Sequence, residues 1–277
     1  MENKPLLGYI SRPGVLHRLS GTSKLILMLA CIIGASVGAD VRYLLALSAV
    51  NIVLWFLSNM KFKDFTFVLV TIAIMMVLNN IFIFLFAPAH GTELFGTKSV
   101  LWEGVGRWQV TWEQLYYQST VTLKYFAVMP TVLLFMATTR PPEFAAALNR
   151  IGIPYRSAYA VNIAMRYIPD IQREYHIISK AQQARGLDTS RRTGVKTRVK
   201  NTVNTIFPLL LGTFERIEEV NAAMELRGFG CGKKRTWYGS RPFAKGDYVL
   251  LVLSVFILAV PIALRITDGG PFWNPFS

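Results

Sequence analysis

The sequence predicts an all-α membrane protein with about five transmembrane helices and a cytoplasmic domain of one short and two long helices. Three observations support this fold class. Of the 277 residues, 52% are hydrophobic and only 17% are charged, a composition too apolar for an ordinary soluble domain. Five apolar runs have lengths close to a membrane span. Most of the excess positive charge falls in one block, residues 138–247.

The apolar runs assign residues 25–137 to transmembrane helices 1–4 and residues 248–277 to a fifth helix with an extracellular tail. The first two helices are short against the roughly 20 residues of a full span. The loop near 88–118 carries three tryptophans and a net charge of −1, which favours an extracellular loop with an interfacial aromatic belt. The predicted spans are residues 25–39, 43–57, 65–87, 118–137 and 248–264.

Charge predicts the orientation of these helices. Residues 1–24 have a net charge of +3 and the pattern of an amphipathic segment, and they are expected to lie on the cytoplasmic side. Residues 138–247 hold 19 Lys and Arg against 9 Asp and Glu, and such an excess is typical of the cytoplasmic side of a membrane protein. We therefore expect a multi-pass protein of the cell membrane with a cytoplasmic N-terminus and a cytoplasmic domain at 138–247.

Three polar residues fall at membrane depth. Asn79 and Asn80 lie in the third predicted span and Lys124 in the fourth. Amides in hydrocarbon generally bond to a neighbouring helix, so a role in packing is favoured over a substrate contact. The alternative is a self-sufficient permease that binds its own substrate there.

Inside the basic block, Pro141 to Ile151 has the apolar spacing of a short helix that closes at Gly152 and Pro154. Two longer helices are expected from about Ser157 and from about Lys196. Each has an apolar half and a strongly polar half that ends in the pattern Ala-x-x-x-Arg-Gly, at residues 181–186 and 223–228. Each pattern follows a proline, Pro169 or Pro208, which suggests a helix start near that proline.

The repeated pattern has two interpretations. An Arg in the last turn suits the helix dipole, and a Gly just past the end is the commonest C-cap. Two copies in the most basic part of a membrane protein favour docking to a partner. The candidate docking residues are Ala184, Arg185, Gly186, Leu226, Arg227 and Gly228.

No catalytic or metal-binding pattern accompanies these motifs. Cys31 and Cys231 are far apart and the three histidines are scattered, so neither a disulfide framework nor a metal site is predicted. Residues 228–234 imitate a phosphate-binding loop, but three residues separate the relevant glycines where four are needed. Nucleic-acid binding has no recognisable module. A lipid-modifying enzyme is the least favoured alternative, so the chain is expected to be non-catalytic and to draw energy from a partner.

The motifs together resemble a known family, the transmembrane T component of energy-coupling factor (ECF) transporters, also called the EcfT/CbiQ family. The resemblance covers nearly the whole chain, and the two Arg-Gly motifs are its most specific part. One departure is that the family often has Asp-Pro-Arg-Thr-Lys after Leu19, where this chain has Ser-Gly-Thr-Ser-Lys at 20–24. The resembling segments are Leu16-His17-Arg18-Leu19, Pro142-Glu143-Phe144, Gly152-Ile153-Pro154, Arg166-Tyr167-Ile168-Pro169, Pro208 and the two motifs.

The resemblance implies an ABC-class importer subunit of a prokaryotic cell membrane. Its coupling helices would insert into grooves on two ATPase subunits, EcfA and EcfA'-like, with each Arg meeting acidic groups. Their apolar surfaces would hold a membrane-embedded S component that binds a vitamin or micronutrient. ATP and Mg would belong to the ATPases, and this chain would hold no cofactor.

Overall fold

The computed structural model describes residues 14–102, 109–187, 194–232 and 236–267. The chain forms two compact units: unit 1 contains Met1–Glu143 and Ser240–Ser277, and unit 2 contains Phe144–Gly239. The expectations for the first 13 residues, for parts of three loops and for the tail from 268 lie outside the described residues.

Unit 1 contains the predicted membrane helices. The described residues include four helices long and apolar enough to cross a membrane, and one shorter apolar helix, α2. This result confirms the all-α membrane class, including the short first helix. The helices of unit 1 are α1 (Val15–Arg18), α2 (Gly21–Val37), α3 (Val41–Ser58), α4 (Thr66–Phe86), α5 (His90–Phe95), α6 (Trp112–Thr138) and α10 (Lys245–Thr267).

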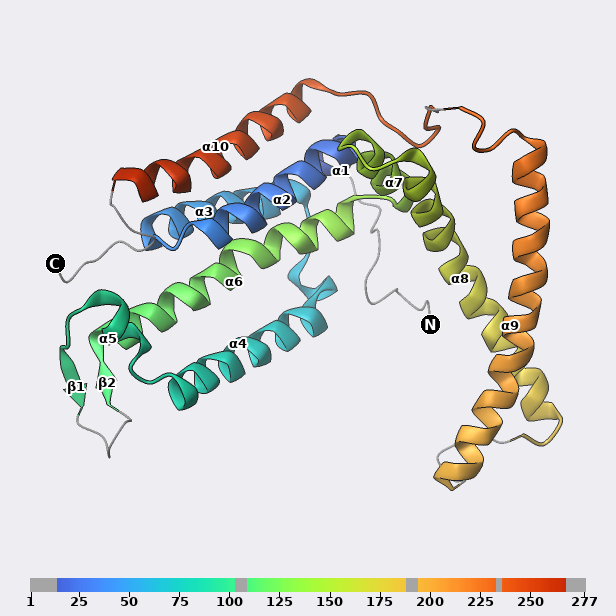
Figure 1. Ribbon diagram of the computed structural model, residues 1–277, viewed down its shortest axis with the longest axis horizontal. Helices are drawn as coiled ribbons and strands as arrows, with labels where there is room; N and C mark the ends of the chain where they lie inside the picture. The colour runs from blue at the N-terminus through green and yellow to red at the C-terminus, as the bar shows by residue number, and fades with distance from the viewer. Residues whose placement is uncertain (1–13, 103–108, 188–193, 233–235, 268–277) are drawn as a thin grey trace. The chain divides into compact units, whose positions relative to one another are not determined.

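The core of unit 1 lies between α2, α3, α6 and α10, which run side by side in Figure 1. Leu27, Leu44 and Leu134 are among its buried apolar side chains. Small residues allow close helix approach, as they do in membrane bundles generally. A Cβ added at Gly34 of α2 would lie only 2.9 Å from the carbonyl oxygen of Ile257 on α10.

Polar groups inside unit 1 are used for packing. The Asn80 side chain donates to Thr122 Oγ1 on α6 at 3.0 Å, as the packing interpretation predicts. The Asn79 Oδ1 is buried without a hydrogen bond among the described residues. A residue that the sequence did not single out, Asn51, donates to the Ala127 carbonyl at 2.6 Å. Pro130 lies three residues further along α6, where it lacks the N–H that would bond to the carbonyl of Phe126.

The loop before α6 differs most from the prediction. The helix begins at Trp112, six residues before the predicted 118, because Thr111 caps it by accepting from Gln114 N at 3.3 Å. Gln114 is polar yet buried, and its Oε1 accepts from Gly91 N at 2.8 Å. The same loop holds α5 and a small antiparallel sheet of β1 (Val100–Trp102) and β2 (Val110–Thr111), which the sequence did not predict.

The first helix also begins earlier than predicted, at Gly21 instead of 25. Ser20 is the N-cap and accepts from Thr22 N at 3.4 Å. The departure from the family at 20–24 therefore retains a helix cap, supplied by serine. Leu16 and His17 are buried, so this part of the predicted amphipathic segment packs into unit 1.

Unit 2 is built from α8 (Tyr155–Ala184) and α9 (Val195–Leu226), with most of α7 (Pro141–Arg150) at its start. These are the predicted one short and two long helices. Pro169 and Pro208 lie inside α8 and α9 and do not begin them. A single proline removes one ladder hydrogen bond, and the helical pattern on both sides of it outweighs that loss.

Candidate functional site

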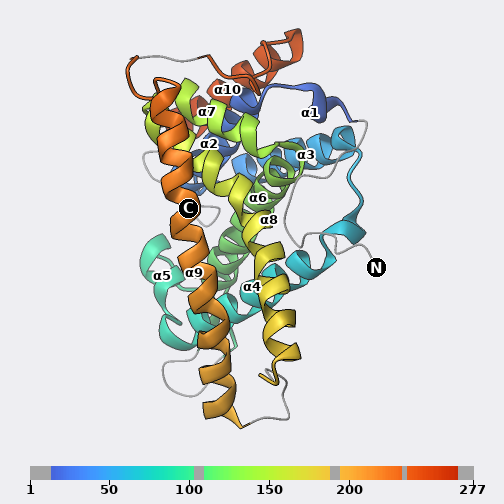
Figure 2. The same ribbon diagram turned by 90° about the vertical axis from the view of Figure 1, so that its right-hand side faces the viewer.

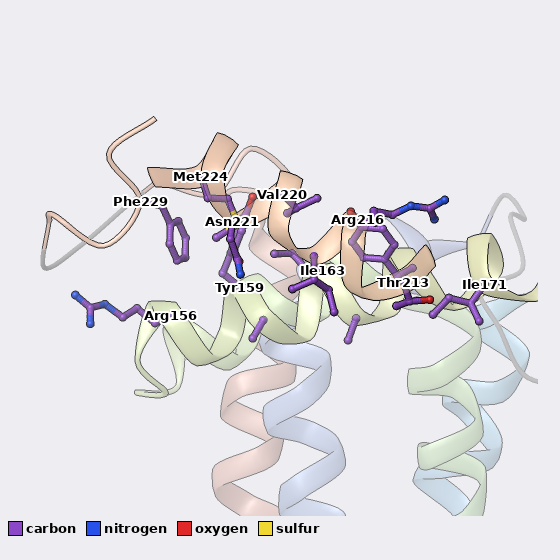
Figure 3. Close-up of a pocket in the computed structure, with 14 residues that line it drawn as sticks. Arg156, Tyr159, Ile163, Ile171, Thr213, Arg216, Val220, Asn221, Met224 and Phe229 are labelled. Carbon is purple, nitrogen blue, oxygen red and sulfur yellow. The ribbon is translucent and has the colours of Figure 1, made fainter. Parts of the chain in front are cut away.

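The two long helices of unit 2 lie side by side and antiparallel in Figures 1 and 2. An ion pair between Arg216 and Glu174, 3.3 Å long, links them. An apolar groove of about 380 Å³ runs along the contact and is lined by residues of both helices, including Tyr159, Ile163 and Val220. Figure 3 shows the side chains of this groove. The groove therefore lies between the first half of α8 and the second half of α9.

The first Arg-Gly end, residues 181–187, closes α8 with a complete Schellman motif. Arg185 is the C-cap, and Gly186 follows with a φ of +85°. Gly186 N donates to the Gln183 carbonyl at 3.0 Å, and Leu187 N donates to the Gln182 carbonyl at 3.0 Å. Two carbonyls that a helix end would leave without partners are thereby satisfied.

The second Arg-Gly end, residues 223–230, repeats this geometry at the end of α9. Arg227 is the C-cap and Gly228 has a φ of +64°. Gly228 N donates to the Glu225 carbonyl at 2.8 Å, and Phe229 N donates to the Met224 carbonyl at 2.9 Å. The C-cap interpretation is thus correct for both copies, and the motif holds each arginine at the same position relative to its helix.

The predicted docking residues face outward. Ala184, Arg185, Gly186, Leu226 and Arg227 are exposed and Gly228 is half-buried. Leu226 is the extreme case, at 90% exposure. Each end therefore presents an apolar side chain followed by a guanidinium, which is a rigid, permanently charged donor for carboxylates.

The structure does not bring the two arginines together. Arg185 ends α8, whereas the segment after Arg227 packs on the beginning of α8, where Phe229 contacts the rings of Tyr155 and Tyr159 at 5.8 and 4.8 Å. Since α8 has 30 residues, the two ends lie roughly 45 Å apart along the pair at 1.5 Å per residue. The six predicted residues therefore form two sites.

The second end has tertiary support in addition to its helix. Arg156 of α8 donates to the Gly230 carbonyl at 2.7 Å. Further on, Trp237 Nε1 donates to Asn149 Oδ1 of α7 at 3.0 Å. Sequence patterns did not identify these contacts, because their partners are far apart along the chain.

A second apolar surface lies along α9 and adjoins the groove at Ile217. Its members are spaced by three or four residues, so they share one face of the helix. The face opposite contains the buried Asn201, Thr205 and Leu209. The members of this α9 stripe, each about half exposed or more, are Val199, Val203, Phe207, Leu210, Phe214 and Ile217.

Two features of the described residues concern metal binding and phosphate binding. Among them, no three His, Cys, Asp or Glu side chains group as metal ligands would. The segment that imitates a phosphate-binding loop follows α9, where a true loop of that kind would follow a strand. Its last residues, 233–235, lie outside the described part of the chain.

Comparisons with known proteins agree on one family. The pattern of the family described as cobalt transport protein, CbiQ, matches residues 14–238. The chain is similar to three proteins named energy-coupling factor transporter transmembrane protein EcfT. The relative from Bacillus subtilis (strain 168) is 26% identical over 278 residues, 96% of this chain and 100% of that protein.

The other two relatives match over a shorter part. The protein from Limosilactobacillus fermentum is 33% identical over 154 residues, 53% of this chain and 57% of that protein. The protein from Exiguobacterium sibiricum is 28% identical over 176 residues, 59% of this chain and 66% of that protein. The chain thus aligns with less than two thirds of the length of these two relatives.

Proposed function

Since the chain belongs to the CbiQ family of cobalt transport proteins, we propose that it is the transmembrane scaffold, or T component, of an ECF-type importer. In this role it transmits the motion of two ATPase subunits to a substrate-binding S component. The chain itself is non-catalytic, and ATP and Mg are held by the ATPases. The importer takes up a vitamin or micronutrient across a prokaryotic cell membrane.

The observation that carries this proposal is the pair of matching Arg-Gly ends. Both present an exposed arginine on the same Schellman motif. A guanidinium held at a helix end suits a groove lined by acidic groups, and lysine would not provide the same planar fork. A separation of roughly 45 Å, from the rise of α8, favours two partner subunits over one shared pocket.

The α9 stripe supports the second part of the proposal. Six apolar side chains about half exposed or more on one helix face suit a membrane-embedded partner such as an S component. Motion at the second Arg-Gly end would reach this stripe directly, because the stripe and that end belong to the same helix, α9. A rigid helix is therefore the element that joins the two kinds of partner.

Orientation follows from charge. The excess of Lys and Arg in 138–247 supports a cytoplasmic position for these residues, the side on which the proposed ATPases would meet ATP. The net charge of +3 in residues 1–24 supports the same side for the N-terminus. The alternative of a self-sufficient permease is weakened, since Asn80 is engaged in bonding between α4 and α6. Substrate binding by the purified chain alone would favour that alternative.

Reversing both charges tests the proposal. Arg185→Glu with Arg227→Glu should abolish co-purification with the ATPase pair, because each helix end would then meet acidic groups with a negative charge. A matched control reverses two exposed arginines inside α8, Arg166→Glu with Arg173→Glu. Full ATPase binding and uptake by the first variant would contradict the proposal.

A further inference from the structure

The chain passes from unit 1 to unit 2 only once and returns only once. The outgoing passage follows Glu143 and the returning passage precedes Ser240. Force that is carried through the backbone between the units therefore crosses these two points. If bonds hold the two passages together, they act as one joint; if not, they act as two separate linkers.

An ion pair joins the two points on the side of unit 1. Glu143 Oε1 lies 2.9 Å from Arg241 Nε, and the Glu143 side chain is 5% exposed. Arg241 also donates to the carbonyl of His17 at 2.5 Å. The returning segment is thus bonded both to the outgoing segment and to α1.

The first turn of α2 holds both segments from the other side. Lys24 Nζ donates to the carbonyl of Thr138, the last residue of α6, at 2.8 Å. Asp247, at the start of α10, accepts from Ser20 N at 2.8 Å and from the Ser23 hydroxyl. Lys24 is 3% exposed and Asp247 is 0% exposed. Hydrogen bonds to buried charges are stronger than those in water, and salt screens them much less than it screens bonds between exposed charges.

The backbone packing at this place is equally close. A Cβ added at Gly21 would lie 2.9 Å from the carbonyl oxygen of Glu143. Glycine is therefore required for the first turn of α2 to lie against the outgoing segment. The junction is defined here as Ser20, Gly21, Ser23, Lys24, Glu143, Arg241 and Asp247.

From this geometry we infer that the junction makes the two crossings a single joint, with Glu143 and Arg241 as its positioning residues. The inference rests on the proposed function, since the joint would pass the motion of the coupling helices to the membrane helices. Without the ion pair, the returning segment would lose its direct bond to the outgoing segment, and part of the motion of unit 2 would be absorbed at the crossings. ATP hydrolysis would then continue while uptake falls.

The test measures coupling in the complete complex with ATPases and S component in proteoliposomes. Glu143→Gln keeps the size of the side chain and removes its charge, and Glu143→Ala removes the contact. Both should assemble normally, and the ratio of uptake to ATP hydrolysis should fall at least about fivefold. The swap Glu143→Arg with Arg241→Glu should recover part of that ratio, which a loss of folding would not allow.

The matched control is Asp170→Asn, which breaks an exposed pair with Arg173, 3.9 Å long, inside unit 2. Its uptake-to-hydrolysis ratio should equal that of the wild type. An unchanged ratio in both Glu143 variants would overturn the inference. So would a ratio that falls as much in the control.

A second measurement separates this inference from the proposed function. Amide hydrogen exchange of the chain alone should rise together in residues 139–146 and 240–247 when Glu143 is replaced by Gln, and it should stay low in the Asp170 control. Failure of the wild-type chain to recruit ATPases would refute the proposed function, while the exchange result would still decide whether one joint exists. If exchange in the two segments changed independently, the inference of a single joint would be overturned.

Discussion

The two Arg-Gly ends have the same backbone conformation but differ in their tertiary contacts. Both close their helix with the same two Schellman hydrogen bonds. The second end is also packed on α8 through Phe229, and through the bond from Arg156 to Gly230. The described residues provide no aromatic contact of this kind to the first end, where Ala184, Arg185 and Gly186 are exposed.

This difference separates local from tertiary causes of order. The Schellman geometry needs only a glycine at the right place, so it recurs wherever the motif recurs. Resistance to opening depends on packing, and helix ends with few buried contacts open most easily. We therefore expect the second end to hold its arginine in place without a partner, and the first end to gain order when an ATPase binds.

The largest effect on this comparison should come from Phe229, whose ring packs against Tyr155 and Tyr159. Phe229→Ala should lower the opening free energy of the last turn of α9 by about 1 to 3 kcal/mol, because a half-buried ring loses its contacts with two tyrosines. Leu187→Ala, at the equivalent place after α8, should cost less than about 1 kcal/mol. Amide exchange of the two last turns measures both, and equal losses would remove the proposed asymmetry.

A smaller and equal effect should follow from changing the two motif glycines. Gly186→Ala and Gly228→Ala should each destabilise their helix end by about 1 to 2 kcal/mol, because L-residues are strained at positive φ. No atom lies within 4 Å of a Cβ added at either glycine, so the cost is purely conformational. Amide exchange of the last turn should rise and ATPase affinity should fall to a similar extent in the two variants. Clearly different costs at the two sites would show that the local motifs are not equivalent.

The smallest effect should come from the bond between Arg156 and the Gly230 carbonyl. Arg156→Gln should destabilise the second end by about 0.5 to 1.5 kcal/mol, the usual net value of one hydrogen bond. The first end should not change, since Arg156 lies at the opposite end of α8. Amide exchange at both ends of the variant measures this, and a change confined to the first end would contradict the described contacts.

Much of the fold could be predicted from the sequence because its signals are local. Apolar runs located all five membrane helices, and periodicity with terminal glycines located α7, α8 and α9. Boundaries failed where polar side chains are buried by distant partners. The loop predicted near 88–118 included Glu113 and Gln114, yet both lie in the first turn of α6, where they accept hydrogen bonds from Ser99 N and Gly91 N.

The candidate site divides in the same way. The sequence by itself determined the two Arg-Gly motifs, because a C-cap depends on neighbouring residues and the special conformation of glycine. Only the tertiary structure decided that the two ends lie at opposite ends of an antiparallel pair, that one of them is braced by Phe229, and that Glu143 meets Arg241. These relations join residues far apart in the chain, and they arise from the packing of whole helices, which no local pattern records.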